Sequence, residues 1–149
     1  MSARNDPARH VDLVEIHLGS GGRVRAKPED VFTQERFLST LRERFGKRTR
    51  DWAFICPNCG DVATGADFKA ALKAHPHTRR DGEPVIPSDI IGQQCIGRTL
   101  GALTKGKYTG RGCDWAAGGL FSGPIYVELP DPEPHWVPSF RIAPAPIPR

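Results

Sequence analysis

Four cysteines constrain the fold of this chain more than any other feature of its sequence. Cys56 and Cys59 stand in the tight turn Cys-Pro-Asn-Cys-Gly, which directs two sulfurs at one point, and two more thiols follow. Closed structural zinc sites take four ligands, and Cys-x-x-Cys turns commonly supply two of them. The sequence therefore predicts one Zn²⁺ ion bound by Cys56, Cys59, Cys95 and Cys113. Because Cys95 and Cys113 lie far apart in sequence, two separate elements must close the site.

The start of the chain bears on the chemistry of these thiols. Residues 1–7 are polar, and the apolar stretch of a secretion signal does not follow them. No apolar run approaches the roughly 20 residues that a membrane span requires. We therefore expect a cytoplasmic protein with no membrane partner, in a reducing compartment where disulfides rarely persist. This expectation favours a metal over disulfides.

Three other interpretations of the cysteines stay open at this point. A redox Cys-x-x-Cys places its first thiol at a helix N-terminus, whereas the helical pattern here starts five residues after Cys59. His75 or His77, which flank a proline in a polar loop, could replace one cysteine as a ligand. The four thiols could also be simple buried cysteines.

The sequence lacks the motifs of the zinc enzymes that it would most resemble. A zinc deaminase needs His-x-Glu before Pro-Cys-x-x-Cys, and a His-Asn-His nuclease needs an asparagine downstream, whereas the asparagines here are Asn5 and Asn58. Catalytic zinc requires an open coordination position, and four thiolates leave none. We therefore expect a structural metal and no enzymatic activity.

Composition indicates a small hydrophobic core that needs a covalent cross-link or a bound metal to stabilise it. Hydrophobic residues make up 38% of the 149 residues, and the chain has 16 Gly and 14 Pro. We expect an α+β, zinc-ribbon-like domain with antiparallel strands, two helices and a Pro-rich C-terminal tail. Its expected division is a disordered N-terminus at 1–9, one zinc-stapled domain at 10–142 and the tail at 143–149.

Hydrophobic periodicity locates the expected elements. Apolar residues at helical spacing predict a helix over 33–45, and Pro28 with two acids after it resembles a helix start. A second helix over 66–74 follows Thr64 and Asp67, which form a capping-box-like pair. The expected strands cover 11–18, 23–25, 52–55, 90–96 (which delivers Cys95) and 125–129, and the segment 136–140 is expected to pack onto the domain.

Basic residues gather in two groups, although the net charge is only +4. Such groups permit phosphate contacts, but a solvated helix end and a mobile loop explain them equally well. Arg98, which follows Cys95, is expected to donate a hydrogen bond to a thiolate or to a nearby carbonyl. A contact with phosphate is the alternative. The candidate nucleic-acid contacts are Arg42, Arg44, Lys47, Arg48 and Arg50 in the first group, Lys105, Lys107 and Arg111 in the second, and Arg98.

Three blocks around the cysteines carry a resemblance. They are Trp52-x-Phe54-x-Cys56-Pro57-x-Cys59-Gly60, Cys95-Ile96-Gly97-Arg98, and Gly112-Cys113-Asp114-Trp115-x-x-Gly118-Gly119-Leu120-Phe121. Together, over about residues 27–140, they resemble a family of small uncharacterised proteins of bacteriophages, prophages and plasmids. The resemblance implies a phage or mobile-element protein in the cytoplasm of its host. It implies no activity, substrate or catalytic residue.

These observations predict a zinc-binding module without catalysis, whose partner is nucleic acid or a host protein. One alternative is an inhibitor or adaptor that acts on a host factor without nucleic acid, and another is an enzyme of unrecognised type. Trp115 and Phe121 are expected to shield the metal from water, with stacking on bases or on a partner as the second possibility.

Overall fold

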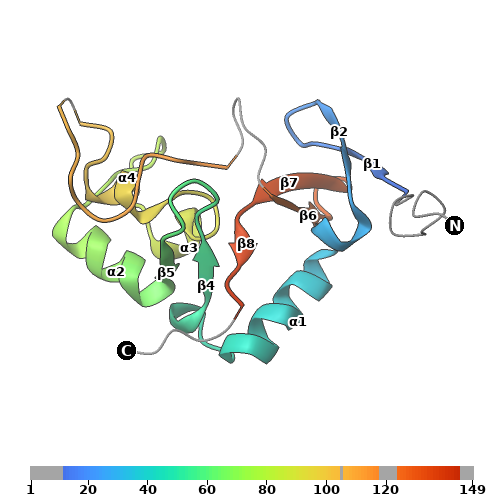
Figure 1. The fold of residues 1–149 in the computed structure, drawn as a ribbon, viewed down its shortest axis with the longest axis horizontal. Helices are drawn as coiled ribbons and strands as arrows, with labels where there is room; N and C mark the ends of the chain where they lie inside the picture. Colours follow the sequence, from blue (N-terminus) through green and yellow to red (C-terminus); the bar gives the residue numbers. More distant parts are fainter. Residues whose placement is uncertain (1–11, 105, 118–123, 145–149) are drawn as a thin grey trace, which may run out of the picture.

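The computed structural model describes residues 12–104, 106–117 and 124–144. Within them the chain forms a mixed α+β fold of small, mostly antiparallel sheets and helices. The predicted disordered N-terminus and most of the predicted tail lie outside these residues, as do Lys105, Gly118, Gly119, Leu120 and Phe121. Figure 1 shows two halves, one containing α2, α3 and α4 and the other containing β6 and β7.

The first half is built around a three-stranded antiparallel sheet with the order β5–β4–β8. Its helices bury Phe68, Leu72, Ile90 and Ile96 against one another and against β5. The strands are β4 (Ala53–Ile55), β5 (Val62–Thr64) and β8 (Arg141–Ile142), and the helices are α2 (Gly65–Ala74), α3 (Pro87–Ile90) and α4 (Ile96–Leu100).

The second half holds a sheet of order β3–β6–β7 and a separate hairpin. β3 runs parallel to β6, whereas β6 and β7 are antiparallel. The hairpin buries Ile16 against Tyr126 of the sheet. The strands are β1 (Val14–His17), β2 (Arg23–Ala26), β3 (Val31–Phe32), β6 (Ile125–Leu129) and β7 (His135–Ser139).

A shared core joins the halves. Helix α1 (Gln34–Phe45) begins at Thr33, whose hydroxyl accepts a hydrogen bond from the Arg36 amide at 3.1 Å. Its Leu41 is fully buried in a cluster that also contains Phe54, Phe140 and two cysteines. After α1 a 3₁₀ turn, η4 (Thr49–Asp51), leads into β4.

The segment from β7 to β8 crosses between the two sheets and is held by the turn after α3. The Phe140 amide donates to the Gly92 carbonyl at 2.8 Å, and the Gln93 side chain donates to the Pro138 carbonyl at 3.0 Å. These bonds place Phe140 beside Cys56 and Cys95. The sheet crossover therefore helps to form the wall of the cysteine site.

The structure confirms several predicted elements. Helices form at α1 and at α2, whose Thr64 and Asp67 make a reciprocal capping box. Strands occur within 11–18, 52–55 and 125–129, the strand predicted at 23–25 extends to Ala26, and the segment 136–140 packs onto the fold through β7.

Three predictions about elements are wrong. Residues 90–96 are not a strand, because Pro87 at a first helical position and the Asp89 carboxylate on the Ile86 amide favour α3, after which Gly92 turns the chain. Pro28 starts only a short 3₁₀ helix, η3 (Pro28–Asp30), and α1 has its own cap. The number of helices exceeds two, since α3 and α4 are additional short helices.

A substitution at Gly65 tests the contact between α2 and η4. A Cβ atom there would collide with the Thr49 carbonyl oxygen and lie 2.8 Å from the Arg50 Cα atom, both of them backbone. We expect Gly65→Ala to lower the free energy of unfolding by about 1–3 kcal/mol, measured by denaturant melts. Gly22→Ala is the matched control, because its nearest atom is a Leu18 methyl at 3.8 Å, and equal melting of the two variants would contradict the packing.

Candidate metal centre

The first two cysteines lie in the hairpin between β4 and β5. The Cys56 amide donates to the Asp61 carbonyl at 2.9 Å, and the Gly60 amide donates to the Cys56 carbonyl at 3.0 Å. Gly60 has φ of +79°, a left-handed conformation that side chains disfavour. The glycine after the second cysteine thus lets the turn close with both sulfurs on the same side.

The other two cysteines come from α4 and from the loop after it. Cys95 is the N-cap residue of α4, and its amide donates to the Trp115 carbonyl at 2.9 Å, beside a bridge between Gln94 and Ala116. A Cβ atom on Gly97 would collide with the backbone of Cys113. Gly97 therefore allows the close approach that sets Cys113 beside Cys95.

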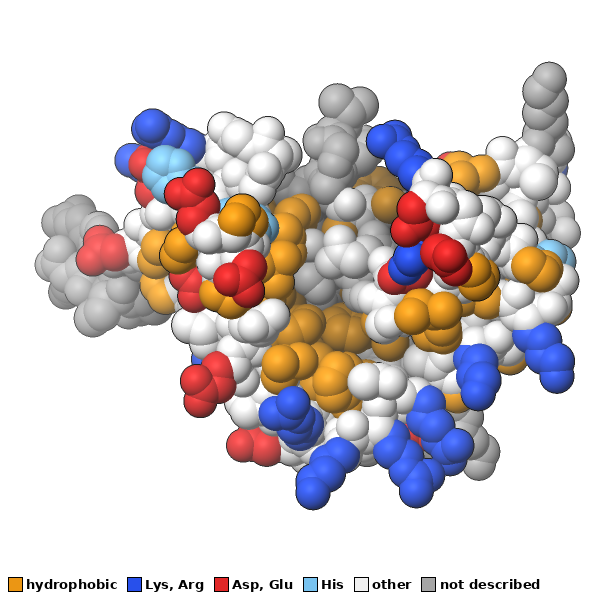
Figure 2. Space-filling model, turned by 180° about the vertical axis from the view of Figure 1, so that it is seen from behind, with side chains coloured by type: hydrophobic (Ala, Val, Ile, Leu, Met, Phe, Trp, Pro, Cys, Tyr) orange, Lys and Arg blue, Asp and Glu red, His pale blue; other side chains and the backbone are white. Residues whose placement is uncertain are grey.

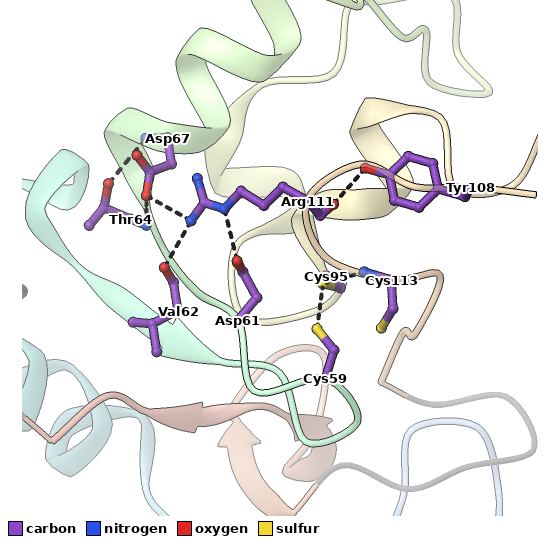
Figure 3. Close-up of polar contacts among 9 residues, drawn as sticks. All are labelled: Cys59, Asp61, Val62, Thr64, Asp67, Cys95, Tyr108, Arg111 and Cys113. Carbon is purple, nitrogen blue, oxygen red and sulfur yellow. Dashed lines mark hydrogen bonds and ion pairs between the residues drawn. The ribbon is translucent and has the colours of Figure 1, made fainter.

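These elements bring the four sulfurs together. The Sγ atoms of Cys56 and Cys113 are 3.7 Å apart, those of Cys59 and Cys95 are 3.6 Å apart, and all four lie within 4.8 Å of one another. Figure 3 shows three of these cysteines converging from the hairpin, α4 and the loop. Such separations exceed the S–S bond length of about 2.05 Å, so the thiols are free. The four predicted ligands thus form one cluster that could hold a metal ion.

Burial opposes ionisation of most of these thiols. Burial raises the pKa of Cys56 and Cys59, and it raises the pKa of Cys95 to about 11. Burial acts in the same direction on Cys113, but hydrogen bonds from the Asn58 side chain and the Trp115 amide lower its pKa overall. Four thiolates at this spacing therefore require a compensating cation.

Amide donors aimed at the sulfurs fit such a charge. The Cys113 amide donates to the Cys95 sulfur at 3.2 Å, and the Asn58 Nδ2 donates to the Cys113 sulfur at 3.4 Å. Donors of this kind orient ligands and spread their negative charge. Cys56 and Cys95 are buried, whereas Cys59 is exposed, so the cluster lies at the edge of the core.

Two sequence-based alternatives find no support in the geometry. The cluster contains neither His75 nor His77, and a ring nitrogen of His77 instead lies 3.0 Å from the Thr99 carbonyl oxygen. Cys56 lies in a strand-to-strand turn, not at a helix N-terminus as a redox pair requires. Trp115 packs against the core cluster that contains Cys56 and Cys95, whereas Phe121, the other residue expected to shield the metal, lies outside the described residues.

Arg111 connects the metal centre to α2, a role that sequence reasoning missed. Its Nε donates to Asp61 at 2.8 Å, and its Nη2 donates to the Val62 carbonyl at 2.9 Å and lies 3.4 Å from Asp67 (Figure 3). The pairing with Asp61 raises the pKa of Arg111. The signal in the sequence was an aspartate directly after the Cys-x-x-Cys turn and a second one in the capping pair.

The structure does not bring the two predicted basic groups together. The five residues Arg42, Arg44, Lys47, Arg48 and Arg50 are exposed at and beyond the end of α1. Lys107 is exposed in the loop near α4, which Figure 1 places at the opposite side of the molecule from the end of α1. Arg98 donates to the Asp114 carbonyl at 2.9 Å, the kind of partner that the sequence suggested.

Replacing Arg111 tests whether this ion-pair network supports the cysteine cluster. Arg111→Gln removes the guanidinium that pairs with the largely buried carboxylates of Asp61 and Asp67, so we expect a loss of about 1–3 kcal/mol in unfolding free energy. Metal retention against a chelator should fall in parallel. Arg79→Gln is the matched control, because Arg79 has the same 39% side-chain exposure and also faces two aspartates, which are more exposed. A loss no larger than that of the control would contradict the role of Arg111.

Comparison with known proteins places the chain in a family. No helix among the described residues is long and apolar enough to cross a membrane. No curated protein matches the chain, and no solved structure matches it. A family model described as VVA0879-like matches residues 33–143, a range that includes all four cysteines and overlaps the resemblance described above. Because this match covers well over half of the 149 residues, the chain belongs to the VVA0879-like family.

Proposed function

We propose that the four cysteines hold one Zn²⁺ ion and that the domain so stabilised is a nucleic-acid-binding module. Zinc binds thiolates at about 2.3 Å in tetrahedral geometry, which sets the distance between neighbouring sulfurs at about 3.8 Å. The Sγ separations of 3.7 Å for Cys56 and Cys113 and 3.6 Å for Cys59 and Cys95 are close to that value. The all-sulfur ligand set, supported by N–H donors, favours zinc in a closed structural site over a hard cation.

The β4–β5 hairpin supplies the ribbon-like part of this proposal. A zinc ribbon carries Cys-x-x-Cys turns at hairpin tips, and Cys56 and Cys59 occupy such a tip. The second pair departs from the pattern, because Cys95 caps α4 and Cys113 lies in a loop. The metal therefore ties a hairpin to a helix and a loop.

Zinc binding should dominate the stability of the domain. Structural zinc binds peptides with about 10–16 kcal/mol, which matches or exceeds the total stability of about 5–15 kcal/mol of a typical domain. We expect near-unit zinc per purified chain, and we expect Cys95→Ser and Cys113→Ser to bind little zinc and to melt without cooperativity. Metal analysis and thermal melts measure both quantities.

His77→Gln is the control for the cysteine variants, because His77 lies outside the cluster and should keep full zinc content. If the purified protein binds less than about 0.2 zinc ions per chain after zinc is added under reducing conditions, the proposed site is wrong. If either serine variant melts as the wild-type protein does, the cysteine replaced in that variant is not a ligand.

The exposed cations beyond the end of α1 carry the nucleic-acid part of the proposal. A helix C-terminus favours cations through its dipole, which accounts for Arg42 and Arg44 in the last turn. It does not account for Lys47, Arg48 and Arg50, which lie past the end of the helix. Five cations within nine residues therefore suggest a phosphate-binding surface.

These cations are largely available for a partner. Arg50 lies 3.9 Å from Asp51 with both side chains more than half exposed, a pair of little energetic weight. Arg44 donates to the Ala143 carbonyl at 2.9 Å and is nevertheless exposed. Contacts of this kind are to phosphate and carry little sequence information. In the proposed setting, a phage or mobile-element protein would use them in its host's cytoplasm.

A triple substitution tests the surface. We expect Arg42, Lys47 and Arg48 changed together to Gln to weaken binding to single- or double-stranded DNA and to reduce the salt dependence. Each lost phosphate contact lowers the logarithmic slope by about 0.9, so three lower it by up to about 2.7. Electrophoretic shifts or anisotropy between about 50 and 200 mM salt measure this slope.

The matched control changes Arg25, Lys73 and Arg80 to Gln, which removes the same charge from exposed positions elsewhere. Equal losses of DNA-binding affinity in the two triple variants would show that binding depends on net charge and not on this surface. Zinc-loaded protein that shifts neither DNA nor RNA at low salt would overturn the proposal. It would favour the adaptor of a host protein instead.

A further inference from the structure

A cleft of about 680 Å³ lies apart from the cysteine cluster, between the two halves of the molecule. Helix α1 forms one side of it, α2 and α3 form another, and β6 and β7 contribute a third. Figure 2 shows hydrophobic side chains in the hollow between the halves. Its volume lies within the range of about 300–1,000 Å³ typical of small-molecule sites.

The lining of the cleft is mainly aliphatic and aromatic. Its apolar side chains come from every wall, and several of them are only partly buried and so remain accessible to a ligand. They are Phe37, Leu38, Leu41, Trp52, Phe54, Ile91, Val127, Leu129 and Val137. No cysteine lines the cleft, so the metal proposed above takes no part in it.

Charge in the cleft has a single sign. Arg50 and Lys69 are its charged lining residues, and neither Asp nor Glu lines it among the described residues. Both cations are exposed and therefore lie at the mouth. Arg50 has only the weak contact with Asp51, and no ion pair of Lys69 occurs within the described part of the chain.

Backbone packing fixes the two cations relative to each other. The Gly65 amide at the start of α2 donates to the Trp52 carbonyl at 3.0 Å. Gly65 also packs so closely on Thr49 and Arg50 that a Cβ atom would collide with them. Lys69 lies one helical turn after Gly65, so it faces the same side of α2 as the residue that touches η4.

We propose that this cleft binds a small amphiphilic anion, an aliphatic or aromatic body with one carboxylate or comparable anionic head. The body fills the apolar interior, and the head lies at the mouth between Arg50 and Lys69. Nucleobases fit less well, because most of the walls are aliphatic and offer little surface for stacking. Arg50 also belongs to the basic group at the end of α1, whereas Lys69 lies outside that group, so a change at Lys69 tests the cleft separately from nucleic-acid binding.

Three probes with the same twelve-carbon chain test the head group. Laurate, dodecanol and dodecyltrimethylammonium are titrated into the zinc-loaded full chain below their aggregation concentrations. Calorimetry measures affinity, and methyl chemical shifts of Leu38, Ile91, Val127, Leu129 and Val137 report on the site. We expect saturable binding of one laurate per chain, weaker binding of dodecanol and the weakest binding of the cation, with shifts centred on these methyl groups.

Variants on the mouth make the test specific. Lys69→Glu should weaken laurate binding by about three- to thirtyfold and leave dodecanol within about twofold, because only the head contact changes. Lys73→Glu is the matched control on the same helix, exposed and outside the cleft. Ser88→Trp, at an exposed lining position, should fill the cleft and weaken laurate and dodecanol alike.

Melting curves of each variant establish that it is folded. Laurate that does not saturate, equal affinity for the three probes, or equal effects of Lys69→Glu and Lys73→Glu would overturn the proposal. Loss of DNA binding in the Lys69→Glu variant would also contradict the assignment of Lys69 to the cleft alone.

Discussion

The convergence of four sulfurs is the constraint on which the rest of the structure depends. Three segments that are distant in sequence, the β4–β5 hairpin, the start of α4 and the loop around Cys113, meet at one point. Thiols attract one another weakly, and burial raises the pKa of Cys56, Cys59 and Cys95. The convergence therefore gains its energy when a cation binds thiolates, and binding of the cation displaces protons from them.

Contacts around the sulfurs extend this constraint into both halves. Arg111 ties the loop of Cys113 to Asp61 in the hairpin and to Asp67, which also caps α2. On the other side Phe140, held by the Gly92 carbonyl, packs on Cys56 and Cys95 and continues into the crossover between the sheets. Loss of a metal at this site should therefore disturb more than the cysteines. Asp61 and Asp67, through Arg111, and Phe140 are held in place by contacts with the same segments that carry the cysteines.

Helices and metal ligands can be predicted from the sequence where a local pattern of residues specifies them. Hydrophobic periodicity predicts α1, periodicity with a capping pair predicts α2, and the residue types and their spacing predict the four clustered cysteines. The apolar residues of 90–96 predict a strand, whereas the segment is the connection from the end of α3 to the start of α4. Pro87, the turn at Gly92 and the hydrogen bond from Phe140 to Gly92 determine that structure. Asp61 and Asp67 stand near predicted features of the sequence, but their pairing with Arg111 depends on tertiary contacts, as does the cleft between the halves.

The proposed metal would stabilise the frame that carries both the exposed cations beyond α1 and the apolar cleft, although neither of them contains a cysteine. The central claim is therefore the identity and coordination of the ion. X-ray absorption at the zinc edge of the purified protein tests it most directly. We expect four sulfur neighbours at about 2.3 Å. A shell that contains nitrogen or oxygen ligands, or fewer than four sulfurs, would contradict it.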